Sequence, residues 1–113
     1  MKKNSFVIML TVLPAAILLW TTGVPGKDDG QGRKIYDEKC QFCHGIKGDG
    51  KGPAAASLNP KPADFNDPRF WQKNNEKKIS ETIEKGHGMM PAFDMKPDEV
   101  KAVIDYISHS FKR

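Results

Sequence analysis

The stretch from Cys40 to His44, Cys-Gln-Phe-Cys-His, constrains this chain more than any other, because it holds both of its cysteines. A disulfide between residues so close in sequence closes a very small ring and stabilises little. A thioredoxin-like dithiol requires a strand–helix–strand setting, which the neighbouring sequence does not offer. A zinc site requires four ligands. Only His87 or His109 is left to complete one, and the second paired motif of zinc fingers is missing.

The spacing C-x-x-C-H is typical of covalent attachment of a c-type haem. On one turn of helix, residues i and i+3 lie on the same side, so the sulfurs of Cys40 and Cys43 can reach the two vinyl groups on one edge of a porphyrin. His44 follows directly and can place its imidazole on the iron. We therefore expect one haem c, bound covalently through Cys40 and Cys43, with His44 as the first axial ligand.

The first 26 residues have the layout of an export segment. Lys2 and Lys3 precede an uncharged, almost wholly apolar run over residues 6–20, as in a secretory signal. The uncharged stretch extends over residues 4–26, which is long enough to span a bilayer, so an uncleaved N-terminal membrane anchor is the alternative. Pro14 and the short apolar core favour cleavage. Either interpretation places the remaining domain, residues 27–113, outside the cytoplasm.

Residues 27–113 favour an all-α fold of three to four short helices joined by long loops. Helical patterns cover residues 33–41, 75–85 and 98–111, and the last has its apolar residues along one helix face. Residues 45–65 hold four glycines and three prolines and are expected to be loop, with one helical turn at residues 54–56. Loops of that length suggest wrapping around a large ligand. A domain of fewer than 90 residues also commonly needs such a cofactor for stability.

The charge of the chain gives little indication of a partner. The formal net charge is +4, from 18 basic and 14 acidic residues, and without Lys2 and Lys3 the basic count falls to 16. No basic run interleaved with aromatic residues is present, so we expect no nucleic-acid partner.

Several motifs spread over nearly all of residues 27–113 match one known family: Gly32-x-x-x-Tyr36, residues 40–45, residues 48–53, residues 59–65, Met90-Pro91-Ala92-Phe93 and Tyr106-Ile107. With these motifs the chain resembles the class I mono-haem cytochromes c, in their bacterial periplasmic branch. The resemblance implies the cytochrome c fold around one haem, a periplasmic location, and a one-electron carrier between redox proteins rather than an enzyme. It also implies a close contact between the first and last helices.

A haem iron held by one histidine needs a second axial ligand, or keeps an open site. In the resembled family the methionine directly before Pro-Ala-Phe is that ligand, which implies Met90, with Met89 as the fallback. His87 in this place would give bis-histidine ligation and a lower potential. We expect Met95 to pack under the last helix and His109 to lie on the surface.

The resemblance suggests two further roles. The carbonyl of Pro53 would accept the Nδ1 proton of His44 and fix its tautomer, unless Pro53 is an ordinary turn proline. Trp71 would bond a haem propionate, unless it simply packs.

Two alternatives for function stay open: a haem sensor or enzyme with a labile Met90, and a haem-containing subunit tethered through residues 4–26 to a larger redox complex.

Overall fold

The computed structural model of the chain describes residues 29–113, and within that range the regular elements are all helical, which confirms the expected fold class. The predicted signal peptide or anchor, residues 1–26, lies outside the described residues. Within residues 29–113, no helix combines the length and apolar character needed to cross a bilayer. The elements are α1 (Asp29–Lys39), α2 (Gln41–His44), the 3-10 helix η1 (Ala55–Ser57), α3 (Pro68–Lys73), α4 (Glu76–Lys85) and α5 (Pro97–Phe111).

The first predicted helix differs from the structure at both of its ends. We expected residues 33–41, whereas α1 begins earlier, at Asp29, and gives way to a separate turn of helix, α2, after Cys40. The N–H of Cys40 still donates to the carbonyl of Tyr36 (2.9 Å), so the chain direction changes without a lost bond. Gly45 then ends α2 with a φ of 86°, a conformation that glycine adopts without a steric penalty.

The sequence patterns did not predict α3, although its start signal is present. Asp67 precedes it, and its side chain accepts a hydrogen bond from the N–H of Arg69 (2.9 Å), while Pro68 occupies the first helical position. The helices α4 and α5 begin within one residue of the expected positions. Asn75 caps α4 by accepting from the N–H of Lys78 (2.9 Å). The turn expected at residues 54–56 is η1.

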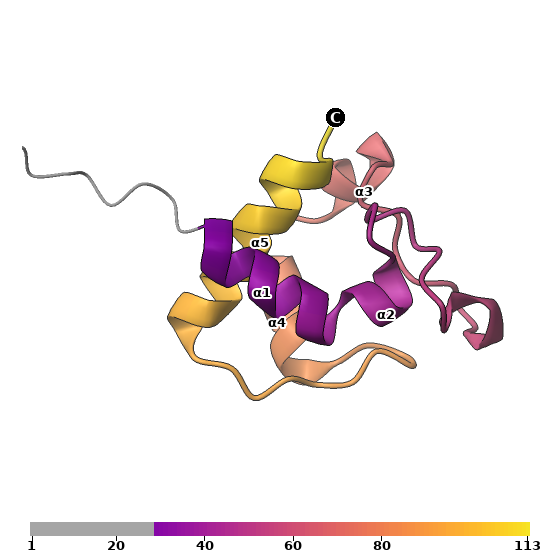
Figure 1. Cartoon of the computed structure of the whole chain (residues 1–113), viewed down its shortest axis with the longest axis horizontal. Helices are drawn as coiled ribbons and strands as arrows, with labels where there is room; N and C mark the ends of the chain where they lie inside the picture. Colours follow the sequence, from indigo (N-terminus) through magenta and orange to yellow (C-terminus); the bar gives the residue numbers. More distant parts are fainter. Residues whose placement is uncertain (1–28) are drawn as a thin grey trace, which may run out of the picture.

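Helix α1 lies across α5, and this crossing fixes the centre of the fold (Figure 1). Gly32 permits the close approach, because a Cβ added there would lie 2.2 Å from the carbonyl oxygen of Ala102. Tyr36, one turn further along α1, is completely buried and its ring centroid is 5.5 Å from that of Tyr106. The Tyr36 hydroxyl donates to the carbonyl of Gly45 (2.7 Å), which connects the crossing to the end of α2. The expected contact between the first and last helices is confirmed.

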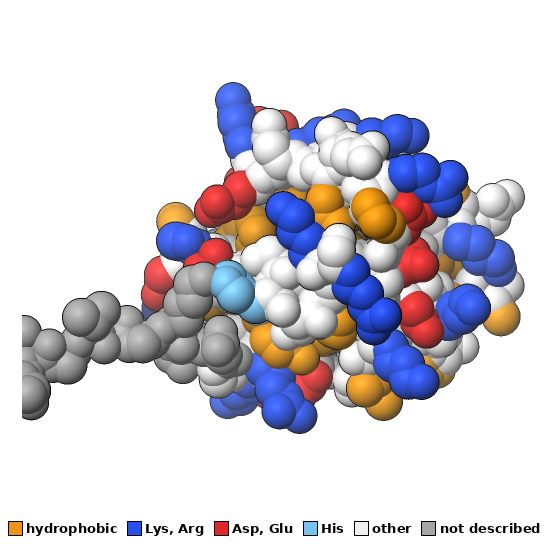
Figure 2. Space-filling model, turned by 90° about the horizontal axis from the view of Figure 1, so that it is seen from above, with side chains coloured by type: hydrophobic (Ala, Val, Ile, Leu, Met, Phe, Trp, Pro, Cys, Tyr) orange, Lys and Arg blue, Asp and Glu red, His pale blue; other side chains and the backbone are white. Residues whose placement is uncertain are grey.

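The hydrophobic core lies between α1, α4 and α5, with Phe65 added from the long loop before α3. Outside it, basic and acidic side chains are mixed over the face that Figure 2 shows, as expected from the nearly balanced charge of residues 27–113. The core residues are Ile35, Tyr36, Phe65, Ile79, Ile83, Val100, Val103, Ile104, Ile107 and Phe111.

Candidate haem site

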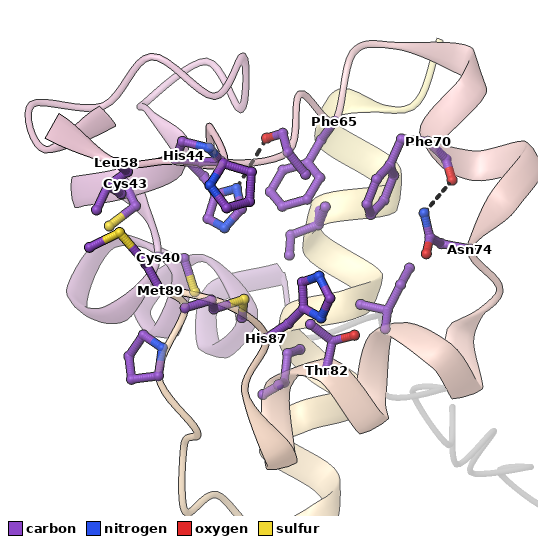
Figure 3. Close-up of a pocket in the computed structure, with 18 of the residues that line it drawn as sticks. Cys40, Cys43, His44, Leu58, Phe65, Phe70, Asn74, Thr82, His87 and Met89 are labelled. Atoms are coloured by element: carbon purple, nitrogen blue, oxygen red, sulfur yellow. Dashed lines mark hydrogen bonds between the residues drawn. The ribbon is translucent and has the colours of Figure 1, made fainter. Parts of the chain in front are cut away.

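A cavity of about 450 Å³ opens beside the core, and we call it the haem pocket. Figure 3 shows the cysteines on one side of it and Phe70 and Asn74 on the opposite side, with His44 and His87 facing each other across the space. The pocket thus brings together most of the residues that the sequence predicted. Its lining is Lys39, Cys40, Cys43, His44, Leu58, Pro60, Lys61, Pro62, Ala63, Phe65, Phe70, Asn74, Lys78, Ile79, Thr82, Ile83, His87, Met89, Met90, Pro91, Phe93 and Ile107.

The two cysteines are free thiols, and both line the pocket from the turn of helix around α2. The N–H groups of Cys43 and His44 both donate to the carbonyl of Cys40 (3.2 and 2.9 Å), so one tight turn presents all three side chains. Burial raises the pKa of the Cys40 thiol to about 11. Redox-active dithiols have a lowered pKa, so this environment disfavours a thioredoxin-like role.

His44 is held with one ring nitrogen engaged and the other available. Its Nδ1 is 3.1 Å from the carbonyl oxygen of Ala63, and its ring stacks on Phe65 with centroids 4.6 Å apart. A carbonyl can only accept, so Nδ1 carries the proton and Nε2 presents a lone pair. Burial lowers the pKa of His44, although the bond to Ala63 acts in the opposite direction. A neutral imidazole with a fixed tautomer is the form that binds metals.

The prediction that the Pro53 carbonyl accepts the Nδ1 proton of His44 is wrong, because the carbonyl of Ala63 accepts it. The residues on both sides of Pro53 donate to carbonyls of the α2 turn. The N–H of Gly52 donates to the carbonyl of Cys43 (3.1 Å), and the N–H of Ala54 donates to the carbonyl of Phe42 (3.0 Å). Pro53 is therefore exposed and does not line the pocket. It is a turn proline.

Residues 86–96, the α4–α5 loop, supply the side of the pocket that His44 faces (Figure 3). His87 and Met90 exchange both backbone hydrogen bonds (3.0 and 2.9 Å) and so form a two-residue turn. Phe93 N–H donates to the carbonyl of Ile83 (2.9 Å), which ties the loop to α4. Met90 is half-buried in the pocket, whereas Met89, at the tip of the turn, is 57% exposed. Burial thus favours Met90 over Met89 as an inward-facing thioether.

Comparison with known proteins identifies the fold that builds this pocket. The family model described as cytochrome c matches residues 30–111. The chain belongs to the cytochrome c family. Domains of this family use a haem for electron transfer, and the pair Cys40 and Cys43 suits its covalent form.

Relatives of this cytochrome include an oxidase subunit, a c-type cytochrome and a chain of a protein complex. It is 32% identical over 92 residues to the cbb3-type cytochrome c oxidase subunit FixP of Bradyrhizobium diazoefficiens, a match that covers 76% of this chain but only 30% of FixP. The KustC0563 c-type cytochrome is 30% identical with a TM-score of 0.63, covering 73% of this chain and 98% of that one. A chain of the Kuenenia stuttgartiensis reducing HAO-like complex is 25% identical with a TM-score of 0.56, covering 73% and 41%.

The residues of the pocket fit a haem. Its walls are largely apolar, including Phe65, Ile79, Ile83 and Ile107, as a porphyrin face requires. Among the described residues that line it, the charged ones are Lys39, Lys61 and Lys78, and none is acidic. A ligand that is flat and apolar but carries two carboxylates matches this combination. Lys78 was not indicated by any sequence pattern, because its pocket position depends on how α4 packs.

Other residues weighed from the sequence lie elsewhere. Trp71 does not line the pocket, and its indole N–H donates to the carbonyl of Phe65 (2.8 Å), so it serves packing and not a propionate. Met95 packs against the core, as expected. His109 is exposed on α5, with Nδ1 2.6 Å from the carbonyl oxygen of Asp105. The sequence also did not indicate Ala63, because its role depends on a backbone carbonyl that no side-chain pattern marks.

Proposed function

We propose that this cytochrome is a one-electron carrier with one haem c, attached through Cys40 and Cys43 and ligated by His44 and Met90. The observation that carries the proposal is the content of the haem pocket. Two free thiols, an imidazole with an available Nε2 and an inward-facing thioether line one apolar cavity. His44 comes from α2 and Met90 from the α4–α5 loop, so the two ligands approach from different elements.

The bound haem would supply an iron that changes between the ferric and ferrous states. With His44 and Met90 both bound to the iron, no site would be left for a substrate, and a carrier is the function that would follow. The soft thioether of Met90 favours the ferrous state and raises the potential. The hydrogen bond from His44 Nδ1 to Ala63 orients the imidazole and increases its basicity. Burial among isoleucine and phenylalanine side chains disfavours the additional charge of the ferric state.

The cysteines also determine which way the haem would face. Its two vinyl groups lie on one edge, so its propionates would point away from Cys40 and Cys43, toward Asn74 and the first turns of α4 (Figure 3). Lys78 lines the pocket there, and its Nζ lies 3.3 Å from the carbonyl of Lys73. Asn74 and Lys78 are thus our candidates for holding the propionates, as an amide donor and a cation.

The cysteine side of the pocket is the candidate docking face for a redox partner. Phe42 on α2 is 65% exposed and Met89 is 57% exposed, so apolar surface surrounds the attachment edge. Lys39 and Lys61 line the pocket and form no ion pair among the described residues. A partner with an acidic rim around an apolar centre would fit this face. Electrons would enter and leave across it in a brief contact of small area.

The relatives favour a second arrangement of the same chemistry, in which this domain is a bound subunit. FixP is named as an oxidase subunit and the Kuenenia protein as part of a complex. An uncleaved segment over residues 4–26 would hold the domain at the outer face of the membrane, whereas a cleaved one would release it into the periplasm. The mass of the mature protein distinguishes these outcomes.

The proposed ligation can be tested by visible spectra of the purified protein in both oxidation states. We expect a pyridine adduct typical of a haem with two thioethers, and a weak long-wavelength ferric band typical of sulfur ligation. Met90→Ala should abolish that band, and the matched control Met89→Ala should keep it. A colourless protein with two titratable thiols would refute the proposal, and ready binding of carbon monoxide by the reduced protein would favour a sensor.

A further inference from the structure

The two-residue turn in the α4–α5 loop presents a second potential ligand beside Met90. His87 and Met90 are directly opposite each other, because each donates its N–H to the other's carbonyl (3.0 and 2.9 Å). Side chains of such a pair project from the same face, with Cβ atoms about 5.5 Å apart. Both residues accordingly line the haem pocket. Figure 3 shows the His87 ring pointing into the cavity, between Thr82 and Met89.

The imidazole of His87 has no structural partner among the described residues. No hydrogen bond, ion pair or ring contact involves its side chain, whereas His44 bonds to Ala63 and His109 to Asp105. His87 is exposed, so its ring can turn without breaking a hydrogen bond or an ion pair. An imidazole that lines the haem pocket and has no such interaction is available to bind the iron.

We propose that His87 is a reserve sixth ligand that competes with Met90 for the haem iron and replaces it in a minority of the ferric molecules, while Met90 ligates the rest. This inference rests on the proposed function, because it requires the haem. A thioether is a soft ligand that suits ferrous iron, whereas an imidazole nitrogen is harder and suits the ferric state. The distance from Cβ to the donor atom is at least as long in histidine as in methionine. Two side chains on one face of one turn can therefore reach the same metal by a small movement of the turn.

The exchange balances without a further reactant. Oxidation passes one electron to the redox partner or to an electrode. In the molecules that exchange ligands, one iron–sulfur bond to Met90 would then break and one iron–nitrogen bond would form with the lone pair of one His87 ring nitrogen. No proton is released, because the other ring nitrogen keeps its hydrogen. Reduction reverses both steps.

The decisive comparison is between Met90→Ala and the double variant Met90→Ala/His87→Asn, both as holo proteins. With His87 as the reserve ligand, the ferric single variant should be six-coordinate and low-spin by absorption and electron paramagnetic resonance. The double variant should be high-spin or water-ligated. Added imidazole should bind the single variant at least about tenfold more weakly than the double variant. In the single variant it must displace His87, which the chain holds at high effective concentration near the iron. Met90→Ala/Met89→Leu is the control and should behave like the single variant.

Voltammetry of the wild type and of His87→Asn provides a test that does not depend on the Met90 variants. Coupled ligand exchange predicts a separation of the oxidation and reduction waves that grows with scan rate in the wild type and disappears in His87→Asn. Identical imidazole affinity in the single and double variants would overturn the proposal, as would identical voltammograms. An unchanged spectrum in Met90→Ala would instead show that Met90 is not the resting ligand, which refutes the proposed ligation as well. The pyridine adduct reports haem attachment separately from both.

Discussion

The replacement Gly32→Ala should destabilise the protein, although alanine is the better helix former. The added Cβ would lie 2.2 Å from the carbonyl oxygen of Ala102 and 2.8 Å from the Cβ of Tyr106. Ordinary contact requires at least 3.4 Å, so α1 and α5 must separate by about 1 Å. The atoms in the way belong to a helix backbone and to a Cβ, which cannot rotate aside as the end of a flexible side chain can.

The net effect follows from two opposing contributions. Overpacking a close contact costs about 1–3 kcal/mol, and a clash with backbone belongs at the upper end of that range. The higher helix propensity of alanine returns up to about 1 kcal/mol. We therefore expect a net loss of about 2 kcal/mol in the free energy of unfolding. For a domain of this size that is a fall of roughly 10 °C in melting temperature.

Guanidinium unfolding of the holo protein, followed by circular dichroism, measures this loss. Gly30→Ala is the matched control, because Gly30 is in the same helix but is exposed. The control should be neutral or slightly stabilising. If Gly32→Ala proves as stable as Gly30→Ala, the helix crossing is looser than the structure shows and the reasoning fails.

Three further replacements probe the buried hydroxyl, the core and the pocket. Tyr36→Phe removes the donor to the Gly45 carbonyl (2.7 Å) and should cost about 1–3 kcal/mol in chemical denaturation with an unchanged haem spectrum; an unaffected midpoint would contradict this. Phe111→Ala should cost about 3–5 kcal/mol, because Phe111 is only 7% exposed; a cost below 1 kcal/mol would count against a packed α5 end. Lys78→Gln should lower the reduction potential, because a nearby cation favours the less charged ferrous state. The expected change is roughly 20 mV, the interaction of two unit charges ~10 Å apart in water. Lys101→Gln, whose Nζ bonds to Asp105 (3.0 Å) away from the pocket, is its control; equal potentials in the two variants would exclude Lys78 as a propionate partner.

The sequence was sufficient to predict the elements with strong local signals. The apolar stripe of α5 and the pair Ile79 and Ile83 of α4 place one helix face in the core, and the structure buries them. The motif around Cys40 concentrated three pocket residues within one turn. α3 was missed because it is short and its signal is a cap and a proline rather than an apolar period.

The pocket was predictable only where a side-chain motif or the family resemblance identifies a role. The haem motif identified Cys43, the resemblance to cytochromes c indicated Met90, and the structure places both residues in one cavity. The resemblance to cytochromes c assigned the acceptor for His44 to Pro53, but an acceptor is a backbone carbonyl whose position depends on the loop path. Asn74 follows the last residue of α3 and lines the pocket, a position that depends on the tertiary fold and that no spacing rule encodes.

The core and the pocket share side chains, and this sharing connects redox chemistry with folding. Phe65 stacks on His44 (4.6 Å) and also lies edge-on to Phe70 (5.1 Å). Ile83 is part of the core, and its carbonyl accepts the N–H that ties down the α4–α5 loop (2.9 Å). A ligand that filled the pocket would therefore complete the core and position the loop that carries Met90. If that loop prefers one oxidation state of the haem, the ferric and ferrous proteins must differ by the same amount in their free energy of unfolding. Ligand binding and folding are linked because they use the same contacts.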